Sequence, residues 1–99
     1  MKRHYELELR EEAEEDIAAS VIWYRVNHPS RVERFLEALE ACFSFIEQHP
    51  TTPTVVEDGI RQFPLRSFPF FVVYTIVDRT ILIIRVFHMS RDERSKLQK

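Results

Sequence analysis

The side chains best suited to chemistry in this chain are arginines and a histidine, all in its second half. They are Arg61, Arg66, Arg85, His88 and Arg91. An arginine guanidinium makes fork-like contacts with phosphate or carboxylate groups, and a histidine can act as general acid or base near neutral pH. The set is typical of a site that holds an anion, either for catalysis on a phosphate or for binding a charged partner.

Several other kinds of site are excluded by composition. One glycine does not make a phosphate-binding glycine loop, and no cysteine and histidine spacing matches a zinc site. Ser90 and Ser95 lie in the tail without a nucleophile elbow around them. The acidic cluster Glu11–Asp16 favours the positive end of a helix dipole rather than a metal ion. We therefore expect neither a cofactor nor a metal.

The net charge of −2 conceals a marked asymmetry along the chain. Residues 1–58 carry six Lys or Arg against thirteen Asp or Glu, whereas residues 59–99 carry eight against three. A basic second half indicates a face that can meet an anionic or acidic partner, the alternative being a solvated surface of uneven charge. Strong general affinity for nucleic acid requires a more basic domain.

The basic side chains are positioned by the most apolar run of the chain, Phe68–His88. It predicts two long strands, Phe70–Val77 and Thr80–His88, that fold back at Asp78-Arg79. Apolar residues occupy both alternating faces of the run. A strand with that pattern lies in the middle of a sheet and is covered on at least part of each side.

Arg85 interrupts the second of these strands. Strict alternation would place it on one face with Ile81, Ile83 and Phe87. A guanidinium in mid-strand must pair with a carboxylate, reach an exposed face or line a solvated groove. A carboxylate pair or an exposed face would give Arg85 a structural role, whereas a solvated groove would give it a functional one. His88 ends the same strand, where a structural hydrogen bond is the alternative to acid–base chemistry.

The rest of the chain predicts an α+β domain spanning residues 1–99. His4–Leu9 alternates as a half-exposed edge strand. A helix begins at Glu11 and ends at the break Asn27–Ser30, and a second helix covers Arg31–Gln48. Ile60–Leu65 alternates again. The expected order is a strand, an antiparallel two-helix hairpin and a three-stranded antiparallel meander, with the helices on one face of the sheet.

Apolar positions at helical spacing predict which side of each helix meets the sheet. They are Ala13, Ile17, Val21 and Tyr24 in the first helix and Val32, Phe35, Leu36, Leu39, Phe43 and Ile46 in the second. Trp23 and Phe45 lie beside these stripes, where they either widen the core or stay exposed for a partner. Cys42 is expected to be a buried helix residue. A single cysteine, with no signal region and no long apolar run, indicates a cytoplasmic protein.

Taken in order, several segments resemble the RelE/ParE superfamily of small toxins from bacterial toxin–antitoxin systems. They are the strand YELEL, Ala13 and Asp16 within EEAEEDI, the helix-ending Pro50, GIRQFPL at Gly59–Leu65, FPFFVVYTI at Phe68–Ile76 and RVFHMSRDE at Arg85–Glu93. The resemblance covers nearly the whole chain. It implies a cytoplasmic toxin with two helices against an antiparallel sheet, and a cognate antitoxin that wraps it with an amphipathic or extended segment, forming a hetero-oligomer.

The superfamily divides by activity. Members similar to RelE cut messenger RNA on the ribosome, and members similar to ParE poison DNA gyrase. The nucleases usually carry an arginine three residues before the tyrosine of the middle strand, where this chain has Phe71 before Tyr74. They also tend to keep a C-terminal tyrosine, which here is Met89 or Gln98. The resemblance therefore favours a ParE-like toxin that acts by binding.

Two alternatives remain open beside gyrase inhibition: a ribosome-dependent endonuclease and a non-toxic interaction module. In the nuclease case the catalytic candidates are the five residues named at the outset. In the binding case the candidates for partner contact are Trp23, Phe45, Arg85, Arg91 and Arg94. An acidic amphipathic helix or an added strand of an antitoxin suits the basic sheet half.

Overall fold

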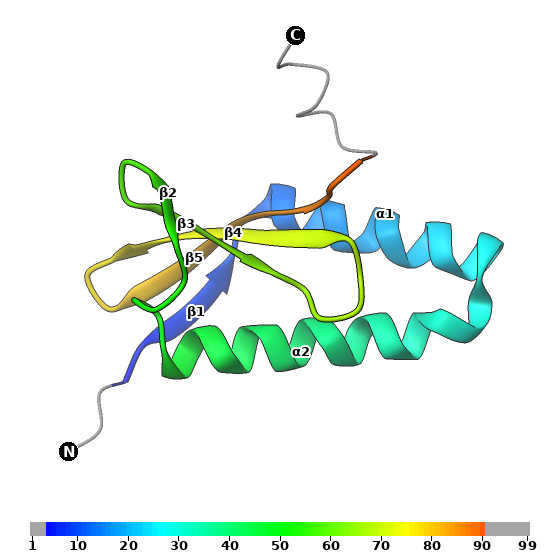
Figure 1. The fold of residues 1–99 in the computed structure, drawn as a ribbon, viewed down its shortest axis with the longest axis horizontal. Helices are drawn as coiled ribbons and strands as arrows, with labels where there is room; N and C mark the ends of the chain where they lie inside the picture. The colour runs from blue at the N-terminus through cyan, green and yellow to red at the C-terminus, as the bar shows by residue number, and fades with distance from the viewer. Residues whose placement is uncertain (1–3, 91–99) are drawn as a thin grey trace, which may run out of the picture.

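Two helices and a five-stranded sheet make up residues 4–90, the part of the chain that the computed structural model describes (Figure 1). The α+β class and the predicted helices are confirmed. In chain order the elements are β1 Glu6–Leu9, α1 Glu11–Asn27, the 3₁₀ turn η1 Pro29–Arg31, α2 Val32–Gln48, β2 Val55–Glu57, β3 Ile60–Pro64, β4 Phe70–Val77 and β5 Thr80–His88.

The sheet has the strand order β1-β5-β4-β3-β2. From β2 to β5 each strand is antiparallel to the next, while β1 is parallel to β5 and forms one edge. The predicted three-stranded meander is therefore one strand too short. The missed strand, β2, is the exposed tripeptide Val55–Glu57, whose pairing with β3 is irregular. It lacks the apolar alternation from which a strand is predicted.

The core lies between the helices and one face of the sheet. Phe70, Val72 and Tyr74 of β4 are fully buried there and cluster with Phe35 and Ile46 of α2. The remaining predicted helix positions also face this core, with one exception. Leu36 is 42% exposed, so its assignment to the buried stripe is wrong.

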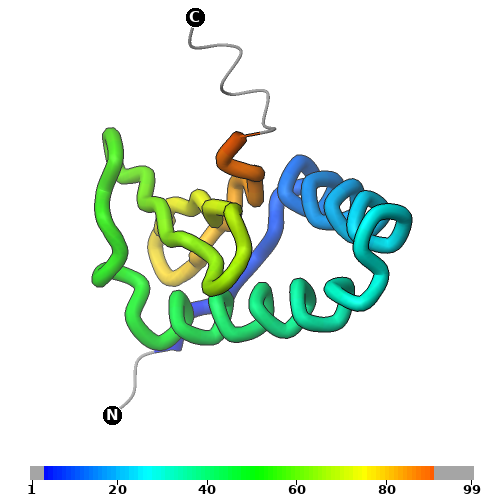
Figure 2. The backbone as a smooth tube through the Cα atoms, turned by 45° about the vertical axis from the view of Figure 1, so that its right-hand side comes forward, coloured from blue at the N-terminus to red at the C-terminus, as the bar shows by residue number. Residues whose placement is uncertain are grey.

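The opposite face of the sheet is covered by no helix or strand within residues 4–90. Figure 2 shows both helices on one side of the sheet, with α1 beside β1 and β5. Phe71 and Val73 of β4 and Leu82 and Ile84 of β5 remain only half-buried. The central position of β4 and β5 is confirmed. On the face away from the helices Phe87 is 7% exposed, which agrees with the predicted cover on at least part of each face.

A bulge in β5 changes which side chains share a face. Val73 pairs with Arg85 and Tyr74 pairs with Ile83, so Ile84 is an extra residue on the β5 side. Tyr74 belongs to the helix-covered face and Val73 to the opposite one. The alternation predicted for Arg85 is therefore wrong in part, because Arg85 shares a face with Phe87 but not with Ile83.

The turn between β4 and β5 forms at the predicted position. Asp78 has a φ of 58°, a left-handed conformation that aspartate tolerates better than most residues. Across residues 4–90, no helix has both the length and the apolar character that crossing a bilayer requires.

Candidate partner-binding surface

Arg85 is held by the carboxylate of Asp16 on α1. Its Nε donates to Asp16 Oδ2 at 2.7 Å and its Nη2 to Oδ1 at 3.0 Å. The backbone N–H of Val86 donates to the same Oδ2 at 2.8 Å. The last backbone hydrogen bond between the β1 segment and β5 is donated by the Arg10 N–H to the Ile83 carbonyl oxygen. Beyond that point the Asp16 carboxylate accepts the Val86 N–H, as a carbonyl of a longer β1 would have done. The internal salt bridge predicted for Arg85 is confirmed.

Arg61 binds the loop between α2 and β2. Its Nη1 donates to the carbonyl oxygens of Thr51 at 3.0 Å and Pro53 at 2.7 Å. Arg61 pairs with Tyr74 across β3 and β4, and both side chains are on the helix-covered face. The guanidinium is therefore engaged with the protein's own backbone.

Tyr74 also binds the loop between α2 and β2. Its hydroxyl donates to the carbonyl oxygen of Pro50 at 2.6 Å, and the residue is fully buried. Burial raises the pKa of this phenol to about 12, although the Arg61 charge opposes the shift. Tyr74 is a neutral hydrogen-bond donor at physiological pH.

His88 lies at the end of β5. Its Nδ1 accepts a hydrogen bond from the backbone N–H of Ser90 at 3.1 Å, and its ring meets the Phe70 ring edge-on at a centroid distance of 5.0 Å. The structural alternative predicted for this histidine, a hydrogen bond at the strand end, is confirmed.

The basic candidates do not converge on one point. Arg61 pairs with Tyr74 and His88 with Phe70, four residues apart along β4, which corresponds to about 13 Å along the strand direction. Arg85 belongs to the opposite face of the sheet. Arg66 follows β3, toward the same end of the sheet as His88. Arg91 and Arg94 lie outside the described residues.

The predicted aromatic contacts, Trp23 and Phe45, are both half-buried. Trp23 packs edge-on against Tyr24 at 5.2 Å and against the His28 ring at 5.7 Å. Phe45 stacks on Phe63 of β3 at 4.9 Å with an interplanar angle of 10°. Trp23 packs against the core cluster and Phe45 covers Phe63, and both side chains still present part of their surface to solvent.

Sequence reasoning missed three exposed apolar residues on the two helices. Ile22 and Val26 are 57% and 75% exposed on α1, and Leu36 on α2 is exposed as well. Ile22 and Val26 stand one turn apart, outside the predicted core stripe. That spacing was the available signal for a second apolar side of α1.

Several apolar and charged side chains of the described residues remain accessible at the surface. These are the half-buried apolar residues on the uncovered sheet face, the three exposed apolar residues on the two helices and the exposed cation of Arg66. Within residues 4–90, no group of three or more His, Cys, Asp or Glu side chains could hold a metal ion.

Comparison with known families decides the assignment. The model of the ParE toxin of the type II toxin–antitoxin system parDE matches residues 7–93, most of the chain. This chain belongs to the ParE toxin family. A ParE-family chain is the toxin component of a type II toxin–antitoxin system, which confirms the predicted superfamily and its ParE-like branch. Among curated proteins, none matches the sequence.

Solved structures show that the ParE family chain has the fold of known toxins. A chain of the chromosomal ParDE system of P. aeruginosa matches with a TM-score of 0.77 and 18% identity, over 88% of this chain and 98% of that one. The isolated E. coli RelE toxin matches with a TM-score of 0.60 and 18% identity, over 95% and 94%. At these identities the likeness concerns the fold.

Proposed function

We propose that this ParE-family toxin is neutralised by a cognate antitoxin and inhibits DNA gyrase by binding it, without cutting RNA. The observation that carries the proposal is the engagement of Arg61, Tyr74 and Arg85 in contacts within the protein. Arg61 and Arg85 are two of the five catalytic candidates of the nuclease alternative, and Tyr74 pairs with Arg61 in the sheet.

Cleavage of RNA by attack of a ribose hydroxyl requires a base, an acid and a cation held together at the phosphate. Arg61 donates to two loop carbonyls and Tyr74 to a third, so neither group faces a substrate. The position three residues before Tyr74 is Phe71, which supplies no charge. This arrangement supports binding over catalysis.

The overall charge supports the same choice. Docking on ribosomal RNA draws its affinity from lysines and arginines that release counterions from phosphates. A chain with a net charge of −2 has little surplus for that purpose. Binding to a protein target or a protein inhibitor does not require such a surplus of positive charge.

The proposed binding site for the antitoxin is the uncovered sheet face, which is the face of the sheet opposite the helices. Phe71, Val73 and Leu82 leave apolar surface partly exposed on it, and Arg85 on the same face is already paired with Asp16. The apolar side of an amphipathic helix suits a surface of this kind, and an added strand suits the edge strand β2. Burial of the surface would stabilise the toxin by mass action, and the pair would form a hetero-oligomer.

The proposal is tested with purified, antitoxin-free protein in two reactions run side by side. One measures DNA supercoiling and trapped cleavage complexes of gyrase, and the other probes messenger RNA for cuts during translation. We expect loss of supercoiling or trapped complexes, with messenger RNA intact. Codon-positioned cuts with gyrase unaffected would overturn the proposal and make Arg66 and His88 catalytic candidates. Inactivity in both reactions would indicate a non-toxic interaction module.

A further inference from the structure

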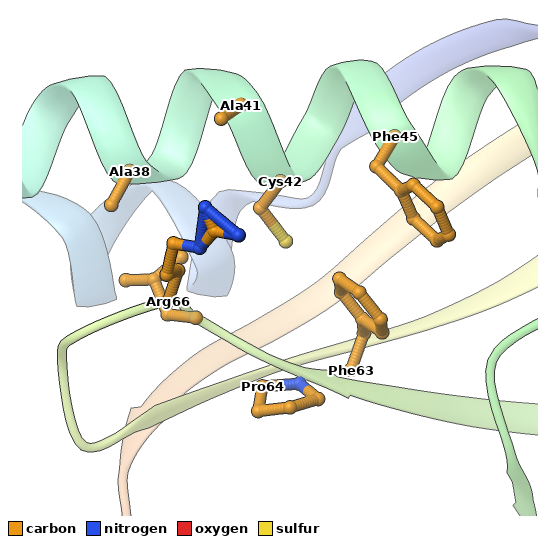
Figure 3. A pocket seen from close by; sticks show the side chains of 8 residues that line it. Ala38, Ala41, Cys42, Phe45, Phe63, Pro64 and Arg66 are labelled. Carbon is orange, nitrogen blue, oxygen red and sulfur yellow. The ribbon is translucent and has the colours of Figure 1, made fainter.

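An apolar pocket lies between α2 and the end of β3, on the side of the molecule away from the uncovered sheet face. Its volume is about 420 Å³ (Figure 3). Ala38, Ala41, Cys42 and Phe45 line it from the helix, at spacings of three and four residues that place them on one side of α2. Phe63 lines it from β3. The volume is within the range of about 300–1,000 Å³ typical of ligand pockets.

Small residues on α2 create this space. Ala38 and Ala41 are lining residues with short side chains, and the stacked rings of Phe45 and Phe63 form one wall. Cys42 completes the lining and is 5% exposed. Burial raises the pKa of its thiol to about 12, so the sulfur is neutral and adds no charge to the pocket.

Arg66 supplies the cation of the pocket. Figure 3 shows its guanidinium turned toward α2, between Ala38 and Cys42. Within residues 4–90, Arg66 makes no hydrogen bond and no ion pair. An arginine with unused donors beside an apolar lining is arranged for a ligand that has both an apolar body and a carboxylate.

We propose that this pocket docks an acidic protein segment, which inserts one large apolar side chain between Phe63 and Ala41 and places a neighbouring carboxylate on Arg66. The Arg66 cation, with its unused donors, favours the carboxylate of the segment. The aromatic wall favours its large apolar side chain. The inference goes beyond gyrase inhibition and does not depend on it, because it concerns a different surface from the uncovered sheet face.

The probes are short alanine-based helical peptides with a fluorescent label. The first carries one Trp and one Glu a turn later, and the second has Lys in place of Glu. Binding to the full chain is followed by fluorescence anisotropy. We expect the Glu peptide to bind at least about tenfold more tightly than the Lys peptide, as charge-assisted hydrogen bonds imply.

Variants locate the binding. Arg66→Gln should weaken the Glu peptide about tenfold and remove its advantage over the Lys peptide, while Arg25→Gln, an exposed cation on α1, should leave both unchanged. Ala41→Phe should block the pocket mouth, and Ala18→Phe on α1 should not. Circular dichroism and thermal unfolding establish that each variant is folded.

Three outcomes would overturn the proposal. They are equal binding of the two peptides to the unmodified protein, unchanged binding to folded Arg66→Gln, and no binding of the Glu peptide at all. A fourth test uses indole-3-propionate, which has the same two groups without a peptide. Binding of this small molecule as tightly as the peptide would assign the pocket to free organic acids and overturn the assignment to a protein segment.

Discussion

The carboxylate of Asp16 holds the guanidinium of Arg85 through two hydrogen bonds of 2.7 and 3.0 Å, and so joins the first helix to the last described strand. The two residues are 69 positions apart in the chain. Because Asp16 also accepts the N–H of Val86, it has two separable roles, one as an ion-pair partner and one as a backbone acceptor.

Substitution at this junction should separate those roles. We expect Asp16→Ala to lower the free energy of unfolding by about 2 kcal/mol, because the Val86 amide and Arg85 both lose their acceptor. Arg85→Ala should cost less, about 1 kcal/mol, because the pair is partly exposed and Val86 keeps its bond. Urea denaturation measures both. Glu15→Ala, an exposed neighbour, is the control, and an equal effect at Glu15 and Asp16 would contradict the assignment.

Removal of the Tyr74 hydroxyl should destabilise the protein. In Tyr74→Phe the carbonyl of Pro50 loses its buried donor, and we expect a loss of about 1–2 kcal/mol. Tyr24→Phe is a matched control, since Tyr24 is also buried but its hydroxyl makes no hydrogen bond within residues 4–90. Chemical denaturation of the two variants should show a clear loss for Tyr74 alone; similar losses in both would argue against the loop contact.

Alkaline pH should weaken the fold through Cys42 and Tyr74. Burial raises their pKa values from 9.0 and 10.0 to about 12 each, so the folded state retains protons that the unfolded state releases. The stabilisation is complete below about pH 9 and is lost as pH rises toward about 12. Under reducing conditions, unfolding free energy should fall across this window, and less steeply in Cys42→Ala. Identical slopes would remove Cys42 from the explanation.

Substitution of His88 distinguishes a binding toxin from a nuclease in cells. We expect His88→Ala to arrest growth as the unmodified chain does, because the ring's described contacts are with Ser90 and Phe70 and it has no role in the proposed binding to gyrase. Growth curves after induction measure the effect, and immunoblots establish equal protein levels. Loss of arrest at an equal level would favour general acid–base chemistry at His88.

The elements with strong local patterns were predicted closely. The bounds of β4 and β5 are the predicted ones, because alternating apolar residues flank a turn at Asp78-Arg79, and α2 begins one residue after its predicted start. The interruption of an apolar strand by Arg85 correctly indicated a carboxylate as one of the possible partners of its guanidinium. The identity of the carboxylate that pairs with Arg85 depends on where β1 ends, and tertiary structure sets the end of β1.

The features that the sequence analysis missed leave little signal in the amino-acid sequence. The bulge at Ile84 inserts an ordinary apolar residue into an apolar strand, so the face of Arg85 changes without any signal in the sequence. Leu36 follows the helical period of the core residues, yet it is exposed, whereas its neighbour Phe35 is fully buried. The pocket at Arg66 depends on two alanines being small opposite a particular loop, a relationship between segments far apart in the chain.

The position of β5 within the sheet affects the order in which the molecule can assemble. β5 follows every other described element along the chain, yet it lies between β1 and β4. During synthesis β1 has no partner until β5 emerges, and the helices have only part of a sheet to pack on. Long-range pairing of this kind is slow to form and leaves apolar surface exposed meanwhile. Newly made chains therefore remain incompletely folded until their last described strand has been made.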